Sequence, residues 1–219
     1  MISIREAWTY AHAAYHMEDL PSGSRIMVHG DDCGYYRVTE DGKLVIGFMG
    51  TGTLGKGTLF QKIRDWVSNL NAFDRNKNGI HDGFDKAVAP FLADIQNAII
   101  NIPHSSVLFT GHSRGGALAV LAAHYINVKC YVVTFAAPGQ GDAEFIIKVN
   151  LNDNLSVINV RVGEDCVPTL PPGTEHSGET IWLKKKKWRG LPLIRRFYNI
   201  ADHLPDSSYE KTIFERFPK

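Results

Sequence analysis

The chain has 219 residues, 44% of them apolar and 21% charged, and its formal net charge is +1. This length suits one well-buried core and falls short of two full-sized domains. The near-neutral charge argues against a nucleic-acid-binding protein that works through its overall charge. The three cysteines (Cys33, Cys130 and Cys166) lack the spacing of a zinc site and imply no disulfide framework.

Hydrophobic spacing predicts helices and strands that alternate along most of the chain. The predicted helices cover 3–19, 61–70, 84–99, 116–123, 141–149 and 209–217. The predicted strands cover 35–39, 43–48, 106–110, 129–135 and 155–162, with an edge strand at 181–183. This alternation predicts a single α/β domain over residues 1–219, with a mostly parallel central sheet flanked by helices on both faces.

The first residues, 1–6, reach charged side chains at once and contain no apolar stretch of a signal peptide. The longest apolar run without a charged residue, 115–128, is too short to span a bilayer. We therefore expect a soluble cytoplasmic protein, with secretion by a non-standard route as the alternative.

The segment 111–115 reads Gly-His-Ser-Arg-Gly and lies between a predicted strand and an Ala/Leu-rich helix. A strand, Gly-x-Ser-x-Gly and a helix form the arrangement that a nucleophile elbow requires. The glycines let the strand and the helix pass closely without Cβ clashes. Ser113 would then be exposed at a helix N-terminus, where the dipole favours developing negative charge. An ordinary glycine-rich turn is the alternative, but the flanking pattern favours an enzyme that forms an acyl-serine.

A serine hydroxyl becomes a nucleophile when a histidine takes its proton and an acid orients that histidine. His203, in a late loop, is the predicted base, and His176 is the reserve candidate. His124 falls well inside the helix after the serine and is interpreted as a packed residue. Asp165 follows a predicted strand and is the predicted acid. Asp202 is interpreted as a turn or cap residue, because neighbours in sequence rarely point at one another.

Eight short blocks of the sequence match the conserved blocks of one enzyme family and occur in the same order. They lie at 48–51, 65–70, 81–84, 110–119, 134–138, 165–172, 176–179 and 202–204. With these blocks the chain resembles the class 3 lipases, the fungal-type triacylglycerol lipase family of the α/β-hydrolases, from about residue 43 to 210. The elbow and the Asp-x-Val-Pro-x-x-Pro-Pro block are the most specific. The resemblance implies an α/β-hydrolase fold, with Ser113 as nucleophile, Asp165 as acid and His203 as base.

The resemblance also implies an oxyanion hole formed by the backbone N–H groups of Thr51 and Arg114, with the Thr51 hydroxyl as a third donor. The chain departs from the family pattern in three places. Met49 stands where the family usually has arginine, Arg114 replaces the usual leucine and adds a cation, and the segment 51–66 is several residues longer. These departures bear on substrate preference and on the lid, whereas the triad is retained.

The segment after the oxyanion loop combines large apolar residues with several glycines. Residues 52–70 are therefore predicted to form a mobile lid, whose substrate contacts are Leu59, Phe60, Ile63 and Trp66. An ordinary surface helix packed on the core is the alternative.

Basic residues are concentrated at 184–187, 189, 195 and 196, beside Trp182 and Trp188. This pattern suits an anionic membrane surface. A solvated hairpin or loop is the favoured interpretation.

Residues 74–85 resemble an EF-hand calcium loop down to the central Gly79. The twelfth position is Asp85 instead of the bidentate glutamate of that motif. An Asn/Gly-rich turn is therefore favoured, and no metal site is predicted.

The sequence predicts a serine carboxylic-ester hydrolase, a lipase acting on acylglycerols or related lipid esters through an acyl-serine. The alternatives are an esterase of short soluble esters, phospholipase A1-type hydrolysis or acyl transfer with the same residues, and a non-catalytic lipid-binding module. The expected partners are a lipid or ester substrate and, transiently, a lipid or anionic membrane surface, with no nucleic acid. The mechanism requires no metal and no organic cofactor.

Overall fold

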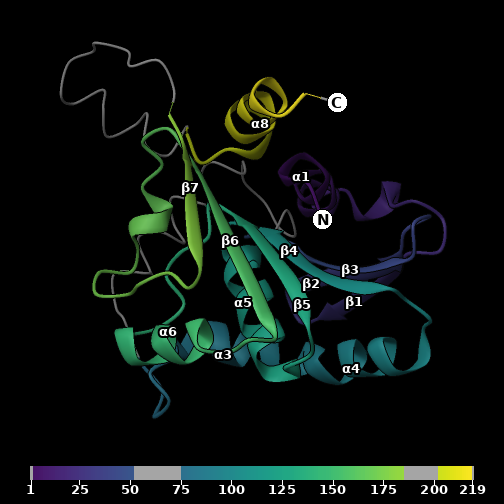
Figure 1. Cartoon of the computed structure of the whole chain (residues 1–219), viewed down its shortest axis with the longest axis horizontal. Coiled ribbons are helices and arrows are strands. Elements are labelled where there is room, and N and C mark those ends of the chain that lie inside the picture. The colour runs from purple at the N-terminus through teal and green to yellow at the C-terminus, as the bar shows by residue number, and fades with distance from the viewer. Residues whose placement is uncertain (1, 52–74, 185–201, 219) are drawn as a thin grey trace.

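A seven-stranded sheet forms the centre of the computed structural model, which describes residues 2–51, 75–184 and 202–218 (Figure 1). The strands are β1 (Arg25–His29), β2 (Asp32–Val38), β3 (Lys43–Phe48), β4 (Ser106–His112), β5 (Cys130–Phe135), β6 (Leu155–Val162) and β7 (Glu179–Leu183). They lie in the sheet in the order of the sequence. The pairs β1–β2 and β2–β3 are antiparallel, and every pair from β3 to β7 is parallel. The predicted mostly parallel sheet is confirmed.

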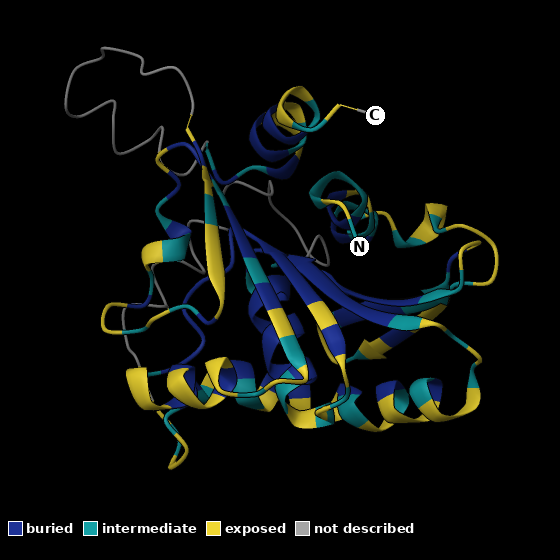
Figure 2. Ribbon diagram, in the orientation of Figure 1, coloured by how far each residue is buried: buried dark blue, intermediate teal, exposed yellow. Residues whose placement is uncertain are grey.

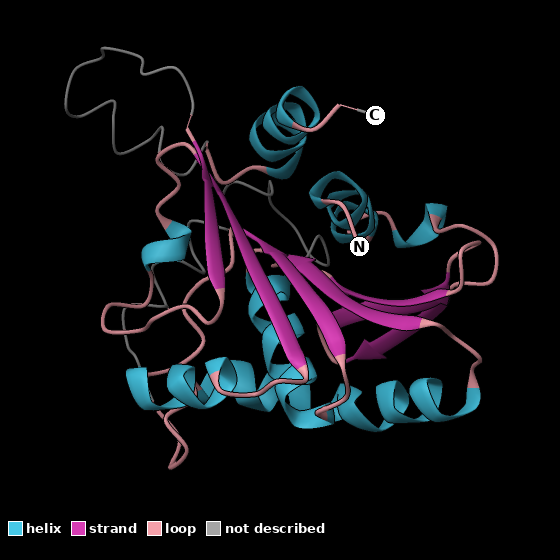
Figure 3. Ribbon diagram, in the orientation of Figure 1, coloured by secondary structure: helices cyan, strands magenta, loops and turns pink. Residues whose placement is uncertain are grey.

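Helices cover both faces of this sheet (Figure 3). They are α1 (Ile4–Ala13), α3 (Asp82–Val88), α4 (Leu92–Asn101), α5 (Arg114–Ile126), α6 (Ala143–Asn150) and α8 (Lys211–Arg216). The described residues also form the 3₁₀ turns η1 (Met17–Asp19), η2 (Ala89–Phe91) and η3 (Val167–Thr169) and the π-helical η4 (Pro205–Glu210). The helices α1 and α8 lie on one face, and α3 to α6 lie on the other (Figure 1). Within the described residues, no helix combines the length and apolar character needed to cross a membrane.

Each face of the sheet has its own hydrophobic core, because alternate residues of a strand point to opposite faces. On β4, Phe109 packs into the core under α5, whereas Leu108 packs into the core under α1, and both are fully buried. The strand β4 is accordingly dark blue over most of its length in Figure 2, and β5 and β6 are dark blue over much of theirs. Two covered faces explain why these strands read as continuous apolar runs in the sequence.

The structure differs from the predicted elements mainly at their ends. The strand β1 is absent from the prediction, because its apolar run of three residues, 26–28, is too short to indicate a strand by itself. The helix predicted over 3–19 ends at Ala13, where Tyr15 and His16 continue into tight turns. The helix predicted over 209–217 is α-helical only over α8, because the preceding turn is π-helical.

Candidate active site

Ser113 is the single residue between β4 and α5. Its φ of 58° and ψ of −134° form a strained conformation that costs a residue with a Cβ about 1–3 kcal/mol. Two neighbours make the turn feasible: a Cβ on Gly111 would lie 2.4 Å from the Gly115 carbonyl carbon, and one on Gly115 would lie 2.3 Å from the Phe48 oxygen. The Ser113 N–H donates to the Phe135 carbonyl at 2.8 Å, which fixes the turn to β5. The predicted elbow geometry is present.

A continuous hydrogen-bonded chain links Ser113 to Asp165 through His203. The Ser113 Oγ lies 2.8 Å from His203 Nε2, and His203 Nδ1 lies 2.9 and 3.1 Å from the two Asp165 oxygens. All three side chains are buried, so the expectation of an exposed Ser113 is wrong for the described residues. Ser113 and His203 are 90 residues apart in the sequence, and His203 and Asp165 are 38 apart, so only the fold brings these groups together. The structure thus assembles the three residues selected from the sequence.

Two further donors hold the Asp165 carboxylate. The Tyr209 hydroxyl donates to Oδ2 at 2.7 Å, and the Val167 N–H donates to Oδ1 at 2.9 Å. Tyr209 is fully buried and also accepts a hydrogen bond from the Val162 N–H at 3.1 Å. Burial, and then the charge of Asp165, raise the pKa of Tyr209 well above its usual value, so the hydroxyl stays a donor. Sequence reasoning missed Tyr209, because no motif distinguishes it from a core aromatic residue.

His112 forms a second layer beside the base. It is fully buried, its ring centroid lies 4.8 Å from that of His203, and its Nδ1 lies 2.8 Å from the Tyr15 hydroxyl. Burial, and then the proximity of His203, lower the pKa of His112 well below its usual value. His112 is therefore neutral near pH 7, and it places no positive charge next to the predicted base.

The other candidates for base and acid lie elsewhere. The His176 Nε2 lies 2.6 Å from the Pro168 carbonyl oxygen, and burial lowers the pKa of His176. His124 packs edge-on against Phe145 of α6, as expected for a packed helix residue. The Asp202 carboxylate accepts the Glu164 N–H at 2.9 Å, so it joins the loop of His203 to the loop of Asp165, a long-range contact that differs from the local turn or cap bond predicted.

The loop after β3 lies against the elbow. A Cβ on Gly50 would fall 2.8 Å from the His112 carbonyl oxygen, so only glycine allows this close approach. Thr51 follows directly, and its buried hydroxyl has no hydrogen-bond partner in the described part of the chain. Arg114 is the first residue of α5, where backbone N–H groups have no intrahelical acceptor. Both expected oxyanion positions thus adjoin the elbow or the glycine that contacts it, and their role stays a prediction.

The two unusual residues of this region are accommodated separately. Met49 is buried and packs with Tyr35 and Cys33, so this position is part of the core. The Arg114 guanidinium forms two hydrogen bonds with the carboxylate of Asp32 on β2, one of them at 2.9 Å. The cation expected near the site is thus neutralised by an ion pair.

Several predicted features lie wholly or partly outside the described residues. The lid over 52–70, with Leu59, Phe60, Ile63 and Trp66, lies outside them, and so does most of the basic cluster. In the calcium-like loop, the Asn76 Oδ1 accepts the N–H groups of Asn78 and Ile80, and Asn76 Nδ2 donates to Asp85 at 2.6 Å. These bonds are those of an Asn-stabilised turn.

The model of the family described as lipase (class 3) matches residues 45–175, which is more than half of the chain. The chain belongs to the class 3 lipase family. Among solved structures, lipase II from Rhizopus niveus aligns with this family member at a TM-score of 0.71 and 22% identity, over 92% of each chain. This structural similarity shows that the present chain has the α/β-hydrolase fold of lipase II and the other lipases it resembles.

Similar curated proteins include secreted mono- and diacylglycerol lipase 1 of Fusarium solani, 29% identical over 136 residues. That match covers 55% of this class 3 lipase and 40% of the relative. Secreted mono- and diacylglycerol lipase MDL2 of Malassezia globosa is 28% identical over 153 residues, covering 57% and 49% respectively. The chain thus spans about half, or less, of the length of these relatives.

The expected cytoplasmic location is wrong. Both of these relatives are named secreted lipases, which points to an extracellular location. The prediction relied on a missing apolar stretch in residues 1–6. Targeting signals lie in segments separate from the folded domain, so the residues of the core and of the site do not indicate the compartment.

Proposed function

We propose that this protein is a serine carboxylic-ester hydrolase that acts on lipid esters through an acyl-Ser113 intermediate. The hydrogen-bonded chain from the Ser113 Oγ through His203 to the Asp165 carboxylate carries this proposal. In that order, the carboxylate orients the imidazole and stabilises its protonated form, and the imidazole is in position to take the serine proton. The strained elbow and the family membership give independent support.

Acylation begins when the Ser113 Oγ attacks the ester carbonyl carbon and its proton passes to His203 Nε2. The carbonyl π electrons move to oxygen, and the resulting oxyanion accepts hydrogen bonds from the backbone N–H groups of Thr51 and Arg114 and from the Thr51 hydroxyl. Collapse of this tetrahedral intermediate expels the alcohol, which takes the proton from His203. Water then repeats the sequence on the acyl-serine and releases the carboxylic acid.

The substrate class follows from the relatives rather than from the described pocket residues. Two of them are named mono- and diacylglycerol lipases, so we propose partial acylglycerols as substrates. A transient contact with an anionic lipid surface is proposed from the exposed Trp182 and Lys184 beside it. Equal sedimentation of the protein with neutral and with anionic liposomes would contradict that contact.

The experiment combines labelling with turnover. We expect a fluorophosphonate probe to label the wild type and not Ser113→Ala, with hydrolysis of monoacylglycerol reduced by about 10⁴-fold or more in the variant. Ser177→Ala, which alters another buried serine, is the control and is expected to keep both signals.

Substrate selection is tested with p-nitrophenyl esters of increasing chain length. Preference for long chains supports a lipid ester, and preference for the acetate ester indicates an esterase of soluble substrates. Retained turnover in Ser113→Ala refutes the proposed mechanism altogether.

A further inference from the structure

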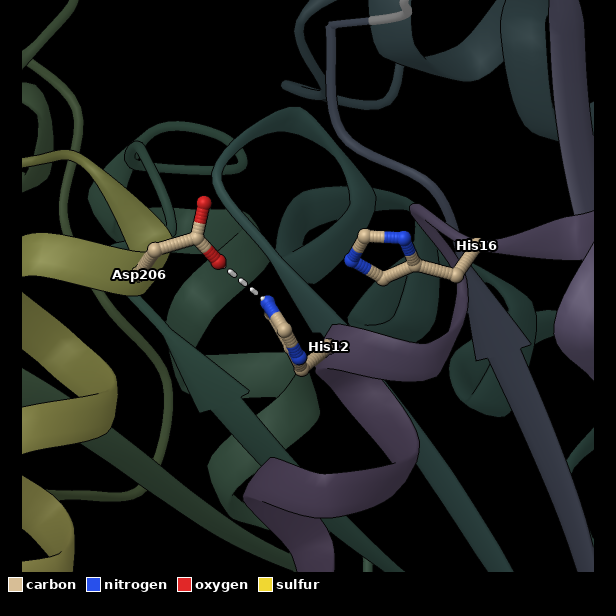
Figure 4. Close-up of side chains that lie close together, drawn as sticks. All are labelled: His12, His16 and Asp206. Carbon is tan, nitrogen blue, oxygen red and sulfur yellow. Dashed lines mark hydrogen bonds and ion pairs between the residues drawn. The ribbon is translucent and has the colours of Figure 1, made fainter.

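Outside the candidate active site, three metal-binding side chains converge between α1 and η4 (Figure 4). His12 is near the C-terminal end of α1, His16 lies just beyond that end, and Asp206 belongs to η4. One nitrogen from each histidine and one carboxylate oxygen all lie within 4.8 Å of one another. We propose that these residues bind Zn²⁺, a site that goes beyond the proposed hydrolase function.

The donor set matches zinc chemistry. Two imidazoles and one carboxylate are ligands that Zn²⁺ commonly takes in four-coordinate sites, with water in the fourth position. Calcium and magnesium prefer oxygen ligands, so the two histidines disfavour these ions. The Asp206 side chain is 70% exposed, so an ion and its water ligand have access from solvent.

The geometry needs a rearrangement of side chains and not of the backbone. Zinc bonds of about 2.0–2.2 Å place neighbouring ligand atoms about 3.4 Å apart. The His12 Nε2 and the Asp206 Oδ1 are already 2.6 Å apart, and the His16 ring centroid lies 5.0 Å from that of His12. The His16 side chain is exposed, so a change of rotamer can bring its nitrogen to the ion. Zinc then takes the place of the proton between Nε2 and Oδ1.

His12 is oriented before any ion binds. Its ring stacks on that of Trp8, with centroids 5.6 Å apart and an interplanar angle of 21°, and Trp8 is fully buried. A ligand fixed by such packing loses little freedom on binding, which favours affinity. The His29–Asp94 pair, 3.0 Å apart, shows the contrast: among the described residues no third ligand completes it.

A second cluster shares His16 and adds Glu18 and Asp19. It contains one imidazole, and all three side chains are exposed, so no packing contact orients them. Zinc affinity falls when imidazole is replaced by carboxylate, which makes the cluster with His12 the stronger site.

The site would connect two segments that support the catalytic groups. Asp206 lies three residues after His203, and the same π-helical turn carries Tyr209, which donates to Asp165. In the structure, the hydrogen bond between His12 and Asp206 joins this turn to α1. Zinc adds coordinate bonds from two histidines and one aspartate, so it should hold the turn against α1 more firmly.

The test measures zinc binding and thermal stability on the full chain, after removal of metal with a chelator. We expect one equivalent of ZnCl₂ to bind in calorimetry and to raise Tm by roughly 5–10 °C at a hundredfold excess over the dissociation constant. MgCl₂ and CaCl₂ should leave Tm unchanged. Co²⁺ should give the intense visible absorption of a four-coordinate site. None of these signals depends on ester hydrolysis.

Variants locate the site. His16→Gln and Asp206→Asn should each weaken zinc affinity about 10–100-fold or more. The zinc-induced shift in Tm of each variant is measured from the metal-free Tm of that same variant. His29→Gln, and Glu18→Gln combined with Asp19→Asn, are the matched controls and should bind zinc as the wild type does. Absence of saturable binding, or wild-type affinity in His16→Gln and Asp206→Asn, overturns the proposal.

Discussion

The Asp165 carboxylate shows how a buried charge is accommodated in this protein. It receives hydrogen bonds from the His203 ring, the Tyr209 hydroxyl and the Val167 N–H. A buried carboxylate without such donors would cost several kcal/mol. The donors also fix its orientation, so the same bonds that stabilise the charge position the imidazole.

Tyr209→Phe tests that positioning role. The ring is kept, but the Asp165 carboxylate loses a donor and the Val162 N–H loses its acceptor. We expect kcat to fall about 10-fold with little change in KM, and the free energy of unfolding to fall by about 1–3 kcal/mol. Steady-state kinetics and urea denaturation give both values.

Tyr125→Phe is the matched control for that variant. The Tyr125 hydroxyl also donates to an aspartate, Asp85, but at the surface between α5 and α3. Its loss should leave kcat unchanged. A kcat for Tyr209→Phe equal to that of Tyr125→Phe would show that Tyr209 has only a structural role.

Among the elements, the pair β4–α5 depends most on small residues at one crossing. The strand and the helix approach so closely at Gly111 that a Cβ there would lie 2.4 Å from the Gly115 backbone. The contact is with main chain, which cannot move aside as a flexible side chain can. The strained φ of Ser113 is therefore maintained by the packing of two elements.

Gly111→Ala should consequently destabilise the fold by about 3 kcal/mol or more. Gly173→Ala is the comparison, because that glycine has open space around it and a φ of +81°. Its substitution costs backbone strain alone, about 1–2 kcal/mol. Equal losses for the two variants in urea denaturation would contradict the packing argument.

A second connection between elements runs from Arg114 on α5 to Asp32 on β2. Both side chains are mostly buried, with 21% and 18% of their surface exposed. Arg114→Leu should lower the free energy of unfolding by about 1–3 kcal/mol, because Asp32 keeps its charge without its partner. Adding Asp32→Asn should recover part of this loss. A strictly additive double variant would show that the two residues do not interact.

Across the whole molecule, the sheet separates two cores, and the groups of the site meet at the ends of the central strands. Ser113 follows β4 and Asp165 follows β6, as expected for a parallel sheet whose functional residues gather at the carboxyl ends of the strands. Tyr15, just beyond α1, contacts His112, and Tyr209 of η4 contacts Asp165. The face of the sheet opposite α5 thus supports the groups of the candidate site.

Stability of the whole fold should decline as the pH falls below the usual histidine pKa. Burial, and then His203, lower the pKa of His112, and the charge of His12 acts in the same direction. At acidic pH the unfolded chain takes up a proton at His112 that the folded chain does not. This difference lowers the free energy of unfolding by about 1.4 kcal/mol between about pH 7.5 and about pH 5.5.

His112→Asn removes the imidazole that takes up this proton in the unfolded chain, and it keeps a polar side chain that can bond to Tyr15. We expect its free energy of unfolding, measured in urea with a chelator present, to depend less on pH than that of the wild type by the same 1.4 kcal/mol, approximately. Parallel pH dependences of the two proteins would show that His112 is protonated in the fold.

Much of the site could be predicted because its residues lie in short motifs or directly after predicted strands. The Gly-x-Ser-x-Gly segment between a predicted strand and a predicted helix indicates a tight turn, and the residues that follow later strands reach the same edge of a parallel sheet. The choice of His203 over His176 also followed from position along the chain. The cellular location was predicted wrongly, because the prediction relied only on the charged residues in segment 1–6.

The sequence alone determined the alternation of strands and helices, the parallel sheet and the elbow, since each depends on hydrophobic period or on steric demands of glycine within a few residues. The tertiary structure decided which polar groups meet across long separations. Tyr209 with Asp165, Arg114 with Asp32, and His12 with Asp206 are pairs of this kind. Such pairs leave no periodic trace in one sequence, because they arise where separate elements pack and each buried polar atom must find a partner.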